Sequence, residues 1–202
     1  NKYNMASILT KIAQQKSAAD VQRYSRASYN WLLQKIKDLK NTTSIPAGVN
    51  REDFRKTNRF ILGGLYCFYY DPKTKDDLPY YDKFPLVLVL ERYPDGFLGL
   101  NLHYLPIKYR VAFLDKLLDY ASYNENDEIK RVRVTYDILS ASKRFKEFQP
   151  CLKRYITTNI KSKIIAVQPN EWDIAMYLPV HQFKKAPASD VWNESVAEIK
   201  SR

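Results

Sequence analysis

Hydrophobic residues in the first segment of the chain recur at steps of three and four. This pattern runs over residues 21–39, with basic side chains such as Arg23 and Lys37 on the other faces, and it predicts an amphipathic helix. A shorter helix is expected at residues 8–12. The turn-forming residues 41–48 end the helical segment, and residues 49–62 form a basic connection to the next part of the chain.

Three strand-like runs follow this connection. Residues 65–70 and the unbroken aliphatic run 86–90 have the length and composition of strands. Residues 97–104 alternate in the manner of a third strand. Asp95-Gly96 lies just before this strand, and an Asp-Gly pair is typical of a tight hairpin turn. We therefore expect the last two strands to pair antiparallel.

After the third strand, the hydrophobic residues of segment 107–120 recur with a helical period. Pro106 suits the start of a helix, so we expect a helix over residues 107–120. The later segments predict helices at 134–142 and 150–157, a strand at 163–168, a short helix or turn in 169–178 and a weak helix at 191–199. This order of elements indicates an α+β protein. Short strands with a late-returning partner favour a small SH3-like β-barrel that is interrupted by helices.

We expect three parts along the chain. Residues 1–48 form a basic helical arm, and residues 49–183 form the SH3-like barrel domain, with the helical insertion at about residues 106–160. Residues 184–202 form a C-terminal tail. The apolar face of the arm must be buried, either on this chain or on a partner, and a basic amphipathic arm is typical of a docking element.

The composition fits a single ordered domain in a chain of 202 residues with 5 glycines. No apolar run approaches the roughly 18 residues that cross a bilayer, and the first residues lack the hydrophobic region of a signal peptide. We expect a soluble protein that is not secreted by this route. Cys67 and Cys151 are either two reduced structural cysteines or a disulfide, and the strand position of Cys67 favours reduced thiols.

The net charge of +11 is unevenly distributed. Residues 1–63 carry 12 basic and 4 acidic side chains, and residues 105–168 carry 13 and 7. In contrast, residues 64–104 carry 4 basic and 6 acidic side chains. Two basic blocks around a near-neutral module favour a nucleic-acid partner. The alternatives are a solvated helix face or a basic arm that docks on an acidic protein.

Sequence motifs for enzymatic chemistry are scarce. The chain has no glycine-rich phosphate loop, and its histidines and cysteines lack metal-ligand spacing. His103, at the end of a strand, is expected to be a hydrogen-bonded structural residue. Pro94-Asp95 with Glu128-Ile129-Lys130 matches the residue order of some nucleases, but Asp95 occupies the hairpin turn. We therefore predict a non-enzymatic protein without cofactor, metal or small-molecule substrate.

The segment between the first two strands is rich in acidic and aromatic residues. It contains Asp71, Asp76, Asp77, Tyr80, Tyr81 and Asp82. One interpretation is a recognition loop on a rigid scaffold. The other is a proline-pinned loop whose tyrosines cover the end of the barrel.

Basic residues in the second half of the chain form the candidate nucleic-acid site. They interleave with Phe145, Phe148 and Tyr155, which are either core residues or surfaces for base stacking. Lysine and arginine neutralise phosphates without reading sequence, so binding should be independent of sequence. The candidate residues are Lys130, Arg131, Arg133, Lys143, Arg144, Lys146, Lys153, Arg154, Lys161 and Lys163.

Residues 66–106 resemble a family encoded by T-even-like tailed phages and their marine relatives. The resemblance is carried by Phe-Tyr-Tyr-Asp-Pro-Lys-Thr-Lys, Leu-Pro-Tyr-Tyr-Asp-Lys-Phe-Pro-Leu and Gly-Phe-Leu-Gly-Leu-Asn-Leu-His-Tyr-Leu-Pro. Further matches are Arg133-Val-Thr-Tyr-Asp137, Lys153-Arg-Tyr155 and Leu178-Pro-Val-His-Gln-Phe183. The family is that of the virion DNA end protector proteins, which complete the filled head. The basic arm lies outside this resemblance.

The resemblance implies a non-enzymatic virion protein that binds the ends of packaged double-stranded DNA and shields them from host exonuclease. It also implies a location in the virion, in the host cytoplasm during assembly, and partners such as portal or neck subunits, with no membrane. The alternative is a structural neck or baseplate component without DNA-end activity.

Overall fold

The computed structural model describes residues 18–41, 60–111, 146–168 and 171–201. The helices expected at residues 8–12 and 134–142 lie outside these ranges. Of the helix expected at residues 107–120, residues 107–111 are helical and the rest lies outside the described residues. Helices and antiparallel strands are both present, which confirms the α+β class.

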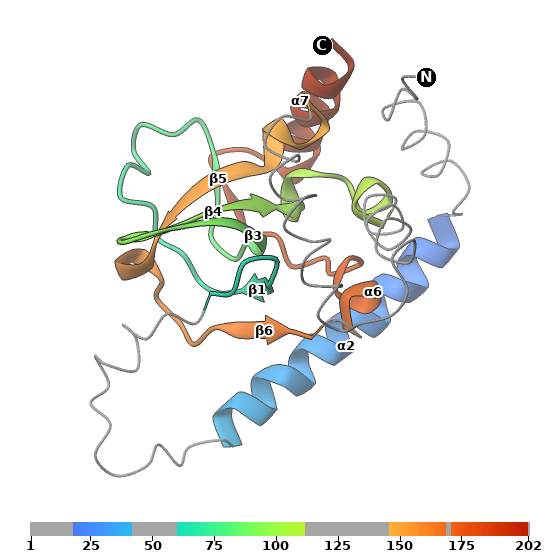
Figure 1. Ribbon diagram of the computed structural model, residues 1–202. Coiled ribbons are helices and arrows are strands. Elements are labelled where there is room, and N and C mark those ends of the chain that lie inside the picture. Colours follow the sequence, from blue (N-terminus) through green and yellow to red (C-terminus); the bar gives the residue numbers. More distant parts are fainter. Residues whose placement is uncertain (1–17, 42–59, 112–145, 169–170, 202) are drawn as a thin grey trace, which may run out of the picture.

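Five strands form one antiparallel sheet, in the order β5-β4-β3-β1-β6 (Figure 1). They are β1 (Leu65–Cys67), β3 (Leu86–Tyr93), β4 (Gly96–Asn101), β5 (Leu152–Ile156) and β6 (Ile165–Val167). A separate pair joins β2 (Tyr81–Asp82) to β7 (Phe183–Lys184). Barrel closure requires the edge strands to meet. Among the described strands, β5 and β6 do not pair with each other, so the sheet is open and the predicted SH3-like barrel is not confirmed.

The predicted hairpin is formed by β3 and β4. Tyr93 pairs with Gly96 across the turn, which confirms the Asp95-Gly96 prediction. A Cβ atom at position 96 would overlap the backbone carbonyl of Tyr155 on β5, so glycine permits this close strand approach. Strand β4 ends at Asn101, before the expected end at residue 104. The Oδ1 atom of Asn101 accepts a hydrogen bond from the backbone N–H of His103 and caps the 3-10 helix η1 (Leu102–Tyr104).

The prediction of a helix at residues 150–157 is wrong. After the 3-10 helix η2 (Lys146–Cys151), the chain extends into β5, where Leu152 pairs with Leu100 and Ile156 pairs with Gly96. Pairing with β4 provides hydrogen bonds for the β5 backbone and outweighs local helix preference. The side chains alternate accordingly, since Arg154 is exposed and Tyr155 is buried.

Both faces of the sheet are buried, which explains the unbroken aliphatic run in β3. Leu86 and Leu88 pack into a mostly aliphatic cluster, whereas Val87 and Val89 contact a cluster of aromatic residues on the other face. The aromatic cluster contains Phe60, Tyr66, Phe68, Tyr70, Phe97 and Tyr155. The two clusters hold the central strands rigidly between them.

Three helices cover the aliphatic cluster. The long helix α2 (Ala18–Asn41) buries Leu32 there and contacts α6 (Trp172–Ala175), while α7 (Ala188–Ser201) packs against η1 and η2 (Figure 1). The Glu171 carboxylate accepts a hydrogen bond from Trp31 Nε1 at 3.2 Å and forms an ion pair with Lys35 Nζ at 2.5 Å. The basic helix thus buries apolar side chains on this chain. The predicted helices at 21–39 and 191–199, the short helix in 169–178 and the strand in 163–168 are confirmed.

Cys67 and Cys151 are free and buried, which confirms the reduced alternative. Burial raises the pKa of Cys151 to about 12, so its thiol is protonated at neutral pH. Among the helices that the structure describes, none combines the length and the apolar character needed to cross a membrane.

Candidate nucleic-acid interface

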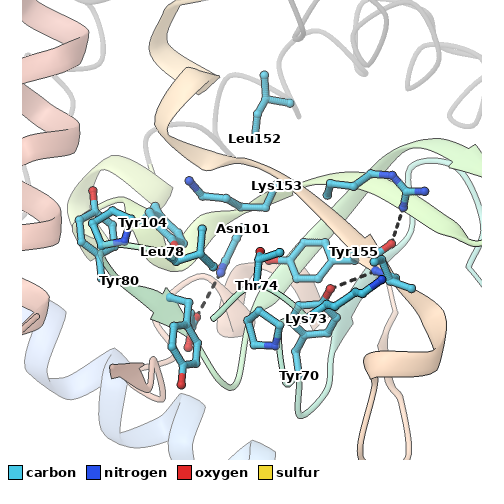
Figure 2. Close-up of a pocket in the computed structure, with 16 residues that line it drawn as sticks. Tyr70, Lys73, Thr74, Leu78, Tyr80, Asn101, Tyr104, Leu152, Lys153 and Tyr155 are labelled. Carbon is cyan, nitrogen blue, oxygen red and sulfur yellow. Dashed lines mark hydrogen bonds between the residues drawn. The ribbon is translucent and has the colours of Figure 1, made fainter. Parts of the chain in front are cut away.

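A pocket of about 440 Å³ opens beside the edge strand β5, between this strand and the loop of residues 71–80 (Figure 2). We call it the tyrosine pocket. It is lined by Tyr70, Pro72, Lys73, Thr74, Leu78, Pro79, Tyr80, Tyr81, Asp82, Asn101, Tyr104, Leu152, Lys153, Arg154, Tyr155 and Ile156. The lining therefore comes from the loop, from the end of β4 and from β5, three segments far apart in the sequence.

Three nearly buried tyrosines form the inner wall of the tyrosine pocket. Tyr70, Tyr104 and Tyr155 expose 6%, 4% and 3% of their surfaces. The ring centroids of Tyr70 and Tyr155 lie 4.9 Å apart, and the Tyr70 hydroxyl accepts a hydrogen bond from the backbone N–H of Ile156 at 3.1 Å. Burial raises the pKa of all three phenols. At neutral pH they are therefore uncharged hydroxyl groups that can donate hydrogen bonds.

Asp82 is the one acidic residue that lines the tyrosine pocket, and its carboxylate is saturated with hydrogen bonds. Oδ1 accepts from the backbone N–H groups of Phe84 and Gln182 at 3.0 and 2.8 Å. Oδ2 accepts from Asn101 Nδ2 at 3.2 Å and lies 2.7 Å from His103 Nδ1. Burial alone would raise the pKa of Asp82, but His103 and the other donors outweigh it and lower this pKa. Because burial lowers the pKa of His103, a neutral imidazole donates to the carboxylate.

Lys153 presents a partly desolvated cation to the tyrosine pocket. Its Nζ atom lies 4.1 Å from the centroid of the Tyr104 ring. Figure 2 shows the side chain extending toward Tyr104, across the pocket from Thr74 and Lys73. In the described part of the chain, no carboxylate lies within ion-pair distance of this ammonium group. Burial lowers the pKa of Lys153, so its charge is held in a partly dry environment.

Arg154, the next residue, is already engaged by the hairpin. It forms an ion pair with Asp95, and its guanidinium group lies 4.4 Å from the ring centroid of Tyr93. It also donates to the backbone carbonyl of Phe97 at 3.3 Å. Arg154 therefore stabilises the β3–β4 turn and contributes positive charge at the border of the pocket.

The C-terminal segment holds the loop of the tyrosine pocket in place. Lys185 Nζ donates to the backbone carbonyls of Asp76 and Leu78 at 2.8 and 2.9 Å. The Tyr80 hydroxyl donates to Glu194 on α7 at 2.7 Å. These bonds hold the loop against α7 and the C-terminal segment, and the loop contributes Lys73 to the pocket.

The predicted basic residues fall into four groups. Lys153 and Arg154 lie at the tyrosine pocket, while Lys161 and Lys163 are exposed between η3 (Thr157–Asn159) and β6. Lys146 begins η2. Lys130, Arg131, Arg133, Lys143 and Arg144 lie outside the described residues.

The nuclease-like pattern gains no support from the described residues. Asp95 lies in the hairpin turn and pairs with Arg154, and Glu128 and Lys130 lie outside the described ranges. Within those ranges, no three His, Cys, Asp or Glu side chains gather closely enough to hold a metal ion. His103 is buried and hydrogen-bonded to Asp82, as the sequence predicted.

Sequence reasoning missed Tyr70, Tyr104 and Lys73, whereas it named Tyr155 as either a core residue or a surface for base stacking. The acidic and aromatic composition of residues 71–82 indicated a loop of interest, which includes Lys73. No local sequence pattern indicates that Tyr70, Tyr104 and Tyr155 line one pocket, because they come together only when β5 pairs with β4.

Comparison with known proteins addresses the whole chain. No curated protein and no solved structure matches it. A family model, that of the phage T4 terminal DNA protecting protein, matches residues 5–195. The match includes most of the basic arm, which the resemblance drawn from the sequence had left out. The chain therefore belongs to the family of the phage T4 terminal DNA protecting protein, and its function is the protection of DNA ends.

Proposed function

We propose that the protein protects the ends of packaged double-stranded DNA by covering them without cleaving them, through basic side chains on β5 and on the segment that connects β5 to β6. One observation supports this site above all. Between residues 148 and 168 the chain carries four basic residues and no acidic residue. The four are Lys153, Arg154, Lys161 and Lys163. The five candidate residues that lie outside the described ranges precede this segment in the sequence.

The chemistry of protection needs affinity and steric cover, not catalysis. Phosphate contacts from lysine and arginine position a protein on DNA without reading its sequence. A protein held at the terminus by such contacts blocks the access that an exonuclease requires. Lys153 and Arg154 lie on the open edge strand β5, and Lys161 and Lys163 lie on the exposed segment that connects β5 to the opposite edge strand β6.

An exonuclease protection assay tests this proposal. Blunt linear DNA is digested with and without the protein at several salt concentrations. We expect full-length DNA to survive at low salt and protection to fall steeply as salt rises, because phosphate contacts release counterions. In the absence of exonuclease and with Mg²⁺ present, the DNA should stay intact. Shortened strands in that control would contradict the non-catalytic proposal.

A matched pair of double variants locates the contacts. Lys161→Gln with Lys163→Gln removes two of the proposed DNA contacts, and Lys184→Gln with Lys200→Gln removes two exposed charges from the C-terminal segment. The first variant should protect DNA less than the wild type, and the second should protect it equally. Equal protection by both variants would exclude Lys161 and Lys163 and assign the contacts to the rest of the chain.

We also propose that the protein acts in the virion, beside portal or neck subunits, after assembly in the host cytoplasm. Support comes from α2, in the expected arm of residues 1–48, where Tyr24, Tyr29 and Leu33 are 46%, 46% and 48% exposed. Such side chains suit a protein contact. A variant with Tyr29→Ser and Leu33→Ser should be retained in fewer copies by purified virions while its free form still binds DNA. Full retention would contradict this contact.

A further inference from the structure

The tyrosine pocket has the size and the chemistry of a site for the end of a DNA strand. We infer that it receives the terminal nucleotide of a strand and binds the phosphate monoester at that terminus. This inference rests on the proposed function, because it assigns an end-specific contact to Lys153, one of the proposed DNA contacts.

The volume of the tyrosine pocket fits one nucleotide. About 440 Å³ lies within the roughly 300–1,000 Å³ of small-ligand sites. This space is larger than a phosphate ion needs and too small for a base pair with both of its sugars. A nucleotide inside a duplex is stacked on both sides, whereas a terminal nucleotide has one stacked neighbour and leaves the stack at a lower cost. The pocket therefore suits a strand end better than the interior of a duplex.

The polar lining of the tyrosine pocket favours an anion. Lys153 contributes an ammonium group that has an aromatic neighbour and no carboxylate within ion-pair distance among the described residues. Lys73 and Thr74 lie opposite it on the loop (Figure 2). The one carboxylate of the lining, that of Asp82, is already bonded by four donors. An incoming phosphate thus meets donors and positive charge, and no further carboxylate belongs to the lining of the pocket, although Glu198 lies near enough to raise the pKa of Lys153.

A terminal phosphate differs from an internal one in charge. A phosphate monoester carries about −1.5 to −2 at pH 7, whereas each internal phosphodiester carries a single negative charge. A partly dry ammonium group gains most from the more highly charged group, because screening by water is weaker there. Lys153 can therefore distinguish an end from the continuous backbone, which exposed lysines such as Lys161 cannot do.

Fluorescence anisotropy with short blunt duplexes tests the inference. Three duplexes of one sequence carry a 5′-phosphate, a 3′-phosphate or hydroxyl groups alone at their ends, and covalently closed circular DNA serves as a ligand without ends. We expect one of the phosphorylated duplexes to bind about tenfold more tightly than the hydroxyl-ended duplex, the effect of one charge-assisted contact. The phosphorylated duplex that binds more tightly identifies the strand end that enters the tyrosine pocket.

Variants then assign the preference to the tyrosine pocket. Lys153→Met keeps the approximate length of the side chain and should abolish the preference, because the cation that meets the terminal phosphate is lost. Lys161→Met removes the same charge outside the pocket and should keep the preference. Lys73→Met, at an exposed position, should reduce the preference without risk to folding. A preference that survives in both Lys153→Met and Lys73→Met would overturn the assignment.

Two failures are distinguishable. If the wild type protects linear DNA from exonuclease but binds phosphorylated and hydroxyl ends equally, the nucleotide pocket is wrong and the proposed function stands. If the wild type binds neither linear nor circular DNA at low salt, both are wrong.

Discussion

Asp82 and Lys153 line the same pocket, but their surroundings differ. The Asp82 carboxylate accepts hydrogen bonds from two backbone N–H groups and from the side chains of Asn101 and His103. The Lys153 ammonium faces the Tyr104 ring and has no carboxylate within ion-pair distance in the described residues. A charge that the fold has fully compensated stabilises the fold. A charge that forms no ion pair within the described fold keeps donors for a ligand.

The position of each residue in the fold explains this difference. Asp82 ends β2, and its carboxylate bonds Gln182 next to β7 and Asn101 at the end of β4, so it ties three segments together. Lys153 lies on β5, an edge strand that pairs on one side only. The comparison predicts that changes at Asp82 act on stability and that changes at Lys153 act on binding.

The largest expected effect is that of Asp82→Asn. The amide presents a donor where several donors already converge and removes the charge that they stabilise. We expect the free energy of unfolding to fall by about 3 kcal/mol, because buried donors lose a charged acceptor and one of them is left unsatisfied. Urea denaturation followed by tryptophan fluorescence measures this change.

The same substitution at Asp71 is the control for Asp82→Asn. Asp71 forms an i,i+4 ion pair with Lys75 at 3.0 Å, and its side chain is 39% exposed. Asp71→Asn should cost less than about 1 kcal/mol, because solvent screens such pairs. Equal losses for the two variants would show that the Asp82 network contributes no more than a surface pair.

The second prediction concerns pH and the histidines beside Asp82. Burial lowers the pKa of His181 from 6.5 to about 4, and positive charge on His103 and Arg110 adds to this lowering. Burial also lowers the pKa of His103. For a folded pKa below the unfolded one, stability is complete above pH 6.5 and falls as pH drops toward 4, because the unfolded chain binds the protons. We expect a loss of about 1–2 kcal/mol in this window, smaller than the full shift would give because His181 is half-buried.

His181→Phe separates this effect from acid effects elsewhere. Phenylalanine keeps a ring beside Phe183 and Trp192, whose centroids lie 5.7 and 5.0 Å from that of His181, and removes the titrating group. Its unfolding free energy should depend less on pH between 6.5 and 4. An unchanged pH dependence would rule out His181 as the source.

Local patterns predicted the elements that depend on local chemistry. The β3–β4 hairpin follows from Asp95-Gly96, and the amphipathic helix α2 follows from its helical repeat. Strand β5 could not be predicted in the same way, because its residues become a strand only by pairing with β4. The tyrosine pocket depends on that pairing, so the sequence indicated Lys153 and Arg154 as candidates but not the pocket beside them.

Lys153→Met gives the third prediction, a small change in stability beside a large change in end preference. Methionine retains the apolar stem and removes a desolvated charge, while the contact with Tyr104 is lost. These contributions oppose each other, so we expect the free energy of unfolding to stay within about 1 kcal/mol of the wild type. Thermal and urea unfolding measure it. A loss as large as that of Asp82→Asn would make Lys153 a structural residue and remove the difference between the two charges.

The smallest expected effect is that of Lys161→Gln on the salt dependence of DNA binding. The Nζ atom of Lys161 donates to the backbone carbonyl of Thr158 at 3.2 Å. Because Lys161 is exposed, the variant should not alter stability. Loss of one phosphate contact should reduce the slope of log affinity against log salt concentration by about 0.9, equally for circular and linear DNA. Lys200→Gln, on α7, should leave the slope unchanged. If Lys161→Gln instead weakened binding to linear DNA alone, Lys161 would itself read the end, and end specificity would no longer belong to the pocket that contains Lys153.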